Sequence, residues 1–513
     1  MSTETEIKLA VHPEGMAAVE KLFAKDSPIL VESTYFDTPD FAFRAKGIQM
    51  RVRRDGDQLL QTVKLAGEDG NSALSRAEHE VEIDDAKPNL THLSLVLPDG
   101  IASKLDLTTL QPIFTTKFMR RRHRGGTDGA AEFAYDQGEI LGRDGATPIS
   151  EVEIELKTAD VAAYVRACLE FLEQVPAGFI DSGKAARGYR LATAEAPQAY
   201  YSSKLALASD MPLPSAIRLM LHHNFSHFLQ NISAVRAGVP EGIHQIRVGL
   251  RRFRSTVSAF KPVLRTREAD AELAAVKAFF NLTGAVRETD VFLAETLPLL
   301  VETGMKPRLA EEVTKAAHRY RQSALDKVIS ALDSTEMARM IISLYGWIEA
   351  GKWMKRTTPL DALLENRPVH AFAAPRLRKL HKKLLKMGRA ARGSVHVADW
   401  HKARISAKKL RYTAEPLLTT LNLDEAEVEQ YRDNISAIQG ELGRLNDLSV
   451  AEDFLKRLIE EAPSKKRKHL KAALDILHQW HLTAEDGFIV EAAKAFRSFE
   501  REGFPVRNGS HAK

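Results

Sequence analysis

The chain has 513 residues and a single cysteine, Cys168, so no intrachain disulfide can form and a structural zinc site built on cysteines is excluded. No hydrophobic run reaches the roughly 20 residues needed to cross a bilayer, and residues 1–30 lack the apolar core of a signal peptide. A glycine-rich phosphate-binding loop is also missing, which excludes the P-loop enzymes. These absences predict a cytoplasmic protein without a membrane partner.

What the chain has in quantity is charge, and that charge is unevenly distributed. Charged residues make up 27% of the sequence and hydrophobic residues 44%, which is typical of a globular protein. Residues 1–200 contain 23 Lys and Arg against 32 Asp and Glu, a net charge of −9, and the remainder contains 50 against 36, a net of +14. This asymmetry predicts two modules with different partners, the second of which favours a polyanion.

The sequence pattern also changes near residue 200. Before it, segments with a period of two alternate with turn sequences such as RRDGDQ, and after it long helical stretches rich in Ala, Leu, Lys, Arg and Glu dominate. The stretch TAEAPQAYYSSKLALASDMPLPS, at 193–215, has the composition of a linker. We therefore predict an α+β protein in which a β domain at 1–200 precedes an all-α domain at 205–505.

Six segments of the first part have one charged face and one apolar face, because side chains alternate along a strand with a period of two. The charged sets are Glu4, Glu6 and Lys8; Arg51 and Arg53; Thr62 and Lys64; Arg76, Glu78, Glu80 and Glu82; Arg120, Arg122 and Arg124; and Glu151, Glu153, Glu155 and Lys157. The simplest interpretation is a half-buried antiparallel sheet with its charges in water. Six strands with charges in blocks of one sign favour instead a closed barrel, with both signs in its lumen and helices over its apolar outer face.

The chemistry of such a lumen suggests its ligand. Arg and Lys suit phosphate groups, since guanidinium forks bind them in a bidentate manner and ammonium groups add point charge. Clustered carboxylates suit Mg²⁺ or Mn²⁺, which bind proteins through a few carboxylates plus substrate phosphates. Both clusters in one cavity indicate a metal-bound polyphosphate, with Glu4 and Glu6 on the metal and Lys8 on phosphate.

The motif Glu4-x-Glu6-x-Lys8 resembles the ExExK signature of the CYTH domain, or triphosphate tunnel metalloenzymes. Further pieces of that family follow in order over about residues 1–195: YFDT at 35–38, Arg51 with Arg53, Lys64, Arg76 with Glu78, Arg120, the acidic strand at 151–155 and SGKAARGYRL at 182–191. The resemblance implies an eight-stranded antiparallel tunnel that hydrolyses or rearranges triphosphates with a divalent metal.

The resemblance also implies roles for individual residues. Metal ligands, or residues that orient metal-bound water, are Glu4, Glu6, Glu153 and Glu155, with Asp136 and Glu151 as weaker candidates. The phosphate path is lined by Lys8, Arg51, Arg53, Lys64, Arg120, Arg122, Lys184 and Arg187. Lys8, Glu4 and Glu6 are expected to be catalytic, whereas Arg76 could equally be a structural partner of Glu78. The implied reaction is attack of a metal-activated water on a terminal phosphoryl group.

The second part contains an internal repeat. HQIRVGLRRFRS begins at His244 and HKARISAKKLRY begins at His401, with bases at the same offsets from each histidine. The residues are His244, Arg247, Arg251, Arg252 and Arg254 in the first copy, and His401, Arg404, Lys408, Lys409 and Arg411 in the second. The histidine and the bases at offsets 3, 7 and 10 fall within a helix face of about 80°. Downstream, GAVRETD at 284–290 corresponds to GRLNDL at 443–448, which predicts two helical units at about 210–370 and 371–500.

A single basic helix face is usually just solvated, but the same face twice in a region of net charge +14 indicates a polyanion-binding surface. The repeated pattern, over about 205–500, resembles the CHAD domain (conserved histidine α-helical domain). That resemblance implies two four-helix bundles facing each other across a basic groove that binds inorganic polyphosphate. Nucleic acid is the rival polyanion, but the few aromatic residues near these helices, Phe253 and Tyr412, make no recognisable stacking platform.

The tandem order resembles bacterial inorganic triphosphatases of the CYTH–CHAD type. We therefore predict a metal-dependent enzyme that hydrolyses inorganic triphosphate to diphosphate and phosphate, with Mg²⁺ or Mn²⁺ as cofactor and polyphosphate as a second ligand. Two alternatives stay open: an enzyme for an organic triphosphate, by thiamine triphosphate hydrolysis or adenylate cyclisation, and a non-enzymatic polyphosphate-binding adaptor. The intact acidic strands argue against the adaptor, whereas only the domain pairing opposes the organic substrate.

Overall fold

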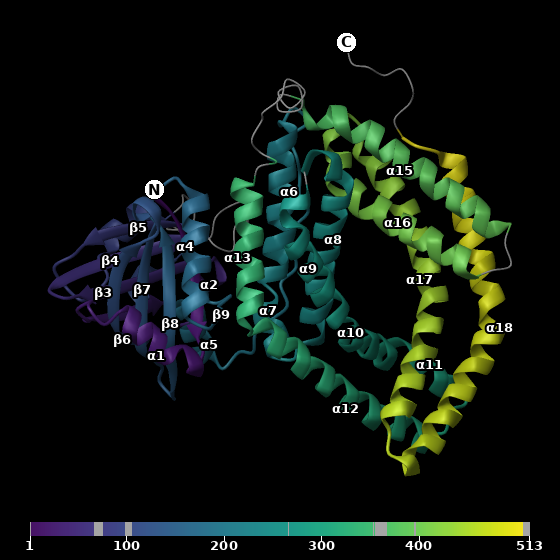
Figure 1. The fold of residues 1–513 in the computed structure, drawn as a ribbon, viewed down its shortest axis with the longest axis horizontal. Helices are drawn as coiled ribbons and strands as arrows, with labels where there is room; N and C mark the ends of the chain where they lie inside the picture. Colours follow the sequence, from purple (N-terminus) through teal and green to yellow (C-terminus); the bar gives the residue numbers. More distant parts are fainter. Residues whose placement is uncertain are drawn as a thin grey trace.

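The computed structural model describes residues 2–65, 75–97, 105–264, 266–351, 353, 367–393 and 397–505. Strands occupy the first part of the chain and long helices the second, so the predicted α+β class is confirmed (Figure 1). In the described ranges, no helix combines the length and the hydropathy that a membrane span requires.

The strands of the first part form a single antiparallel sheet that closes on itself. Its strands are β1 (Ser2–Val11), β2 (Ile29–Asp37), β3 (Ile48–Asp55), β4 (Gln58–Leu65), β5 (Ser75–Glu82), β6 (Gln111–Gly125), β7 (Ala131–Leu141), β8 (Ala146–Leu156) and β9 (Ala177–Phe179). Neighbours follow the order β5-β4-β3-β2-β6-β7-β8-β1, and β1 pairs back to β5, which closes an eight-stranded barrel. The predicted barrel is therefore confirmed, and the short β9, which the sequence analysis did not anticipate, adds to β1.

The two faces of the barrel strands differ as the alternation predicts. Ile7, Leu9, Val152 and Ile154 are buried against α4 (Val161–Gln174), which covers the outside of β1 and β8. Around the barrel lie α1 (Met16–Leu22), α2 (Ala42–Ala45), α3 (Leu90–Val96) and α5 (Lys184–Thr193). Because the apolar side is covered by helices, the charged residues between these positions point into the lumen.

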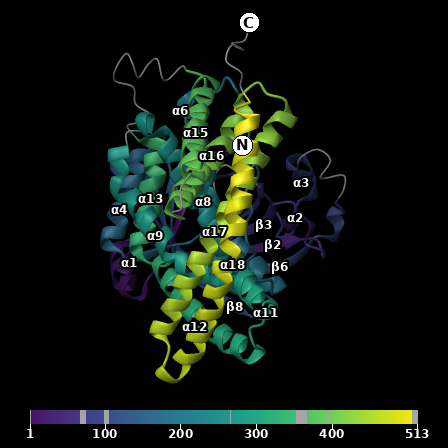
Figure 2. The ribbon, with the colours of Figure 1, turned by 90° about the vertical axis from the view of Figure 1, so that its right-hand side faces the viewer.

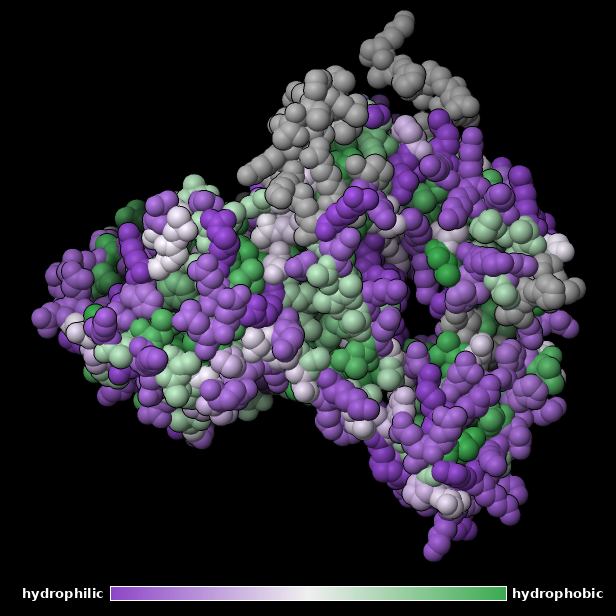
Figure 3. Space-filling model, in the orientation of Figure 1, coloured by the Kyte–Doolittle hydropathy of each residue, from purple (hydrophilic) through white to green (hydrophobic). Residues whose placement is uncertain are grey.

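The second part is helical throughout its described ranges. Its helices are α6 (Leu213–Leu229), α7 (Ile232–Arg236), α8 (Pro240–Leu264), α9 (Asp270–Leu282), α10 (Gly284–Val291), α11 (Leu297–Glu302), α12 (Pro307–Leu332), α13 (Thr335–Ala350), α15 (Val369–Arg392), α16 (Val397–Leu417), α17 (Glu425–Glu461) and α18 (Ser464–Glu502). The longest pair, α17 and α18, runs side by side along one edge of the molecule (Figures 1 and 2). An opening surrounded by these helices is visible in the space-filling view (Figure 3).

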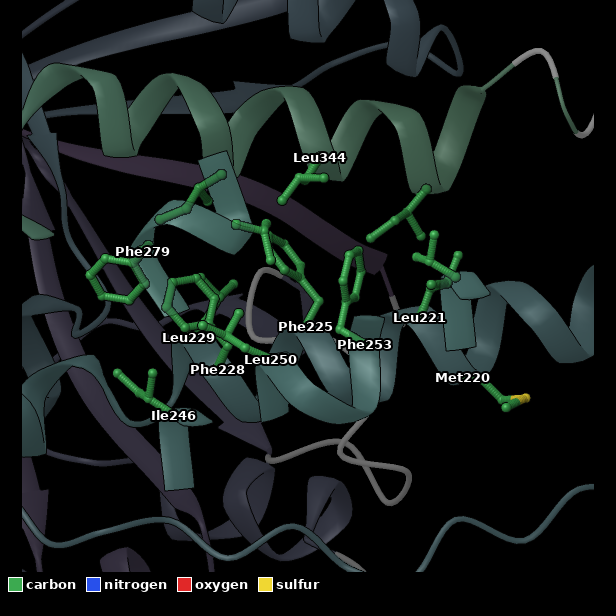
Figure 4. Close-up of a cluster of buried hydrophobic side chains, with 14 of the residues drawn as sticks. Met220, Leu221, Phe225, Phe228, Leu229, Ile246, Leu250, Phe253, Phe279 and Leu344 are labelled. Atoms are coloured by element: carbon green, nitrogen blue, oxygen red, sulfur yellow. The ribbon is translucent and has the colours of Figure 1, made fainter. Parts of the chain in front are cut away.

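One continuous apolar core joins the barrel to the helices. Phe225 and Phe228 of α6, Phe253 of α8 and Phe279 of α9 pack together beneath Leu344 of α13 (Figure 4). The other side of α13 packs against α4 and β9 of the barrel. The two parts therefore share buried apolar surface instead of being connected only by the linker.

Candidate active site and anion pocket

Three carboxylates form the centre of the barrel lumen. Asp136 lies on β7, and Glu151 and Glu153 lie two residues apart on β8, so both glutamates face the same side. The register places Asp136 opposite Glu151, and Lys8 of β1 opposite Glu153. One oxygen from each acid lies within 4.8 Å of the others. Of the predicted metal ligands, Glu153 is in this group, together with the two weaker candidates Asp136 and Glu151.

Three bases compensate the three carboxylates. The Lys184 ammonium lies 2.6 Å from Asp136, 2.5 Å from Glu151 and 2.9 Å from Glu153. Arg120 donates two hydrogen bonds to Asp136, at 2.6 and 2.5 Å, and a third to Glu153 at 2.5 Å, and Arg187 donates to Glu151.

This arrangement keeps the central groups charged. Burial alone would favour the neutral form of Glu153, but Lys184, Arg120 and Lys8 outweigh it and hold the pKa of that carboxyl well below its usual value. Burial likewise opposes the charge of Lys184, yet Glu151, Glu153 and Asp136 raise its pKa. The Glu153 carboxylate and the Lys184 ammonium are therefore both charged at neutral pH, 2.9 Å apart.

The helix α5 delivers Lys184 and Arg187 to the acids. Its first residue is Lys184, and its inner side, with Ala185 and Tyr189, packs on a lumen-facing apolar cluster that includes Phe114 of β6. Gly188 is required for this contact, since a Cβ atom there would clash with the Phe114 ring. The close approach of α5 to β6 sets how far Lys184 reaches into the barrel.

A second group of bases lies on β3 and β4. Arg51 and Lys64 both face Glu78 of β5, at 3.7 and 3.2 Å, while Arg53 pairs with Glu80 at 2.8 Å. The buried Nε atoms of Arg51, Arg53 and Arg187 have no hydrogen-bond partner among the described residues. Buried donors of this kind are costly unless they are satisfied, and oxyanion ligands would satisfy them.

The other predicted tunnel residues have different neighbours. Lys8 pairs with Glu6 on its own strand, Arg122 contacts Asp55 at 3.2 Å, and Glu155 contacts Lys157 at 2.6 Å. Glu6 and Glu155 face each other across β1 and β8 but do not belong to the three-carboxylate group. The side chains of Glu4 and Arg76 lie outside the described residues.

The three-carboxylate group fits a divalent cation. Its donors are all oxygens, as Mg²⁺ and Mn²⁺ prefer. Oε1 of Glu151 forms an ion pair with the Lys184 ammonium at 2.5 Å, so a metal bound here would compete with that ammonium for the oxygen. The Lys184 ammonium occupies the space between the acids, so a bound metal and Lys184 would share these oxygens.

The repeated histidine helices meet at a pocket of about 380 Å³ in the helical part. Its walls include His244, Arg247 and Arg251 of α8 and Arg404 and Lys408 of α16. Burial, together with Arg404 and Arg251, lowers the pKa of Lys408 to about 7, and burial with the neighbouring guanidinium of Arg251 lowers that of Arg247 to about 10. Burial is the largest cause of both shifts, and repulsion between the neighbouring cations adds to it; an anion in the pocket would relieve that repulsion.

The remaining residues of the repeat lie elsewhere. Arg252 pairs with Glu415 at 2.7 Å, Arg254 stacks over the Phe280 ring, and Lys409 donates a 2.5 Å hydrogen bond to Ser258. His401 and Arg411 are exposed and do not line the pocket. The equal spacing in the two helices therefore brings only part of each pattern to the pocket.

Sequence reasoning assigned no role to several residues that line the sites. Arg287 and Glu288 of α10 and Asp447 of α17 come from the downstream repeat segments and line the pocket, whereas Glu295 and Gln439 had no signal of their own. In the barrel, Glu78, Glu80 and Asp55 pair with Lys64, Arg53 and Arg122, and the sequence did not predict these pairings. The alternation placed Glu78 and Glu80 on the charged face of β5, but it could not say which base each would meet.

Comparison with known proteins agrees with both parts of this description. Residues 2–189 match the CYTH domain and residues 219–456 match the CHAD domain. The inorganic triphosphatase of Haemophilus influenzae is 31% identical over 202 residues, 37% of this chain and 55% of that protein, so the chain spans only about half the length of that relative. An uncharacterized protein of Mycobacterium tuberculosis is 25% identical over 419 residues, 78% of each chain.

A solved structure supports the assignment of the helical part. The crystal structure of the CHAD domain from the plant Ricinus communis has a TM-score of 0.51 and 26% identity, and the alignment covers 60% of this chain and 98% of that chain. Taken with the closed barrel and the paired histidine helices, these matches mean that the chain contains a CYTH domain at residues 2–189 followed by a CHAD domain at residues 219–456.

Proposed function

We propose that the barrel hydrolyses inorganic triphosphate to diphosphate and phosphate with a divalent metal. The observation that carries this proposal is the buried group Asp136, Glu151 and Glu153 inside a closed lumen whose walls are lined with Arg and Lys. The name of the Haemophilus relative, an inorganic triphosphatase, supports it for the matched region.

The chain's own residues would divide the work between acids and bases. Asp136, Glu151 and Glu153 would hold Mg²⁺ or Mn²⁺, as we also propose for Glu4 and Glu6 on β1 and for Glu155, further along β8. A bound metal would supply a water of lowered pKa and neutralise phosphate charge. The carboxylates would orient that water toward the terminal phosphorus atom.

The bases would bind the substrate along the lumen. Arg51, Arg53 and Lys64 on one wall and Arg120 on another would bind phosphate oxygens and stabilise charge on the transferred group, with Lys8, Arg122, Lys184 and Arg187 as further contacts. The unpartnered Nε atoms of Arg51 and Arg53 support this role, because a phosphate oxygen would satisfy each. Triphosphate would thus replace the carboxylates as the partner of these guanidinium groups.

We also propose that the CHAD pocket binds inorganic polyphosphate. His244, Arg247, Arg251, Arg404 and Lys408 surround it, and their mutual repulsion favours an anionic ligand. The other residues of the repeat would raise the positive electrostatic potential around the pocket without contacting the ligand within it. They are the exposed His401 and Arg411, together with Arg252, Arg254 and Lys409. On this account residues 1–200 and 205–505 act as separate binding units for short and long phosphate chains.

The test of the tunnel is phosphate release from inorganic triphosphate, ATP, thiamine triphosphate and long-chain polyphosphate, each with Mg²⁺, Mn²⁺ or chelator. We expect inorganic triphosphate to be preferred and chelator to abolish turnover. The Glu153→Gln variant should lose most activity, whereas Lys117→Met, at an exposed position on the outer face of β6, should keep it. Preference for thiamine triphosphate or ATP would replace the proposal with the organic alternative.

A further inference from the structure

The segment that carries Lys184 into the lumen is held from outside the barrel. Asp181 lies three residues before Lys184, and its side chain is only 4% exposed. Among the described residues its hydrogen-bond partners come from the CHAD domain: the Ser233 backbone N–H at 2.8 Å, the Ser233 hydroxyl at 2.5 Å and Arg236 Nη1 at 2.7 Å. Arg190 of α5 also interacts electrostatically with Asp181. In Figure 1, α7, which carries both partners, lies next to β9 and α5 at the junction of the two domains.

Arg236 makes two further hydrogen bonds at this junction. Its Nη2 donates to the backbone carbonyl of Phe179 at 3.0 Å, and its Nε donates to Asp333, just before α13, at 2.8 Å. Within the barrel, the Ile180 N–H donates to the Lys8 carbonyl at 2.9 Å. The stretch 179–181 is therefore fixed on one side by β1 and on the other by the CHAD domain.

We propose that Arg236 and Ser233 of the CHAD domain are positioning residues for the tunnel, acting through Asp181 on Lys184. This inference rests on the proposed function, since it assigns these residues to the same reaction. Lys184 lies within 2.9 Å of three carboxylates, and so dense a set of contacts depends on where α5 begins. A shift of about 1 Å in such a group is enough to change turnover.

The burial of Asp181 and its ion pair with Arg236 support a positioning role, and not only a role in holding the two domains together. Asp181 is buried, and a buried carboxylate without its cation is strongly unfavourable, so Arg236 restricts the segment to one place. Another contact between the domains, Arg339 with Glu173 at 3.9 Å, is largely exposed and lies on α4, away from α5. Arg339 is thus a matched control from the same junction.

The experiment uses the full chain with four substitutions: Arg236→Met, Arg236→Lys, Arg339→Met and Lys184→Met. We expect Arg236→Met to lower kcat/KM for inorganic triphosphate roughly threefold to tenfold, because the charge-assisted contacts of Lys184 with the carboxylates would be weakened but not removed. Arg236→Lys should recover much of the lost activity, and Arg339→Met should leave the kinetics unchanged. Should Arg236→Met not fold, Ser233→Ala removes one hydrogen bond to Asp181 and should give the same effect in smaller measure.

A double-mutant cycle separates positioning from general destabilisation. In the Lys184→Met background, Arg236→Met should change kcat/KM by less than about twofold, because its target is already absent. Equal losses from Arg236→Met in both backgrounds would overturn the inference.

A second readout needs no substrate. Amide hydrogen exchange in residues 180–188 should be faster in Arg236→Met than in the wild type and unchanged in Arg339→Met. Unchanged exchange in Arg236→Met would overturn the positioning role even if activity fell. If the wild type hydrolyses no triphosphate, the proposed function fails, and the exchange experiment still decides whether Arg236 holds this segment.

Discussion

Removing the Lys184 ammonium should destabilise the barrel markedly at neutral pH. Its side chain is 8% exposed and contacts three carboxylates at 2.5–2.9 Å. Breaking a buried ion pair typically costs about 3–5 kcal/mol. In the Lys184→Met variant each acid would keep one guanidinium, Arg120 for Asp136 and Glu153 and Arg187 for Glu151. We therefore expect the lower end of that range, about 3 kcal/mol.

The pH dependence of this loss follows from Glu153. Its pKa in the folded protein is depressed below the ordinary value of 4.5, so the stability that it contributes is fully present above pH 4.5 and is lost as the pH falls through the folded pKa. Without Lys184 the folded pKa of Glu153 moves back toward 4.5 and that contribution shrinks. The difference between wild type and variant should therefore be largest at neutral pH and should close below pH 4.5.

The assay is thermal unfolding followed by calorimetry at pH 7 and at pH 4, with and without Mg²⁺. For a domain of the size of the barrel, a loss of about 3 kcal/mol corresponds to a drop in Tm of about 6–12 °C. Mg²⁺ should raise the Tm of Lys184→Met more than that of the wild type, since the vacated space lies among three carboxylates. The control Lys157→Met removes a partly exposed lysine and should cost about 1 kcal/mol or less. An unchanged Tm of Lys184→Met at pH 7 would refute this account of the lumen.

Three further predictions concern other parts of the structure. Polyphosphate affinity should fall as the pH rises from 6 to 8, because the pKa of Lys408 is about 7 and the anion binds best when Lys408 is protonated. Titration calorimetry should show a weaker pH dependence for Lys408→Arg than for the wild type. Either Arg51→Ala or Lys64→Ala should lower kcat/KM about tenfold or more, and wild-type kinetics in both would place them outside the substrate path. Gly188→Ala should cost about 1–3 kcal/mol by overpacking and lower activity, whereas Gly440→Ala, where a Cβ atom meets open space, should do neither in the same unfolding and turnover assays.

The period-two pattern of β1, β3, β4, β5, β6 and β8 was enough to predict a closed barrel with a charged lumen. It could not rank the acids, because the strand register and the docking of α5 decide which carboxylates converge. Asp136 and Glu151 were rated below Glu4 and Glu6, yet they lie with Glu153 at the centre of the described lumen.

The sequence pattern of the helical repeat likewise could not predict which of its residues meet at one site. Its spacing predicted a basic face on each of two helices, and the resemblance to the CHAD domain implied a groove between them; in the structure His244 and Arg404 line one pocket. Equal spacing along two helices fixes which residues share a face, but the neighbours of each face depend on tertiary packing. His401 is therefore exposed although His244 lines the pocket. The hold on Asp181 had no sequence signal, because its partners Ser233 and Arg236 are distant in the chain.

The central claim is that the barrel cleaves inorganic triphosphate with a metal held by buried carboxylates. Phosphorus NMR of inorganic triphosphate incubated with the full chain and Mg²⁺ or Mn²⁺ tests it most directly. We predict diphosphate and phosphate in equal amounts, no products in chelator, and a loss of at least about a hundredfold in rate for Glu153→Gln. Intact triphosphate with the wild type in both metals, or undiminished turnover by Glu153→Gln in chelator, would contradict the account.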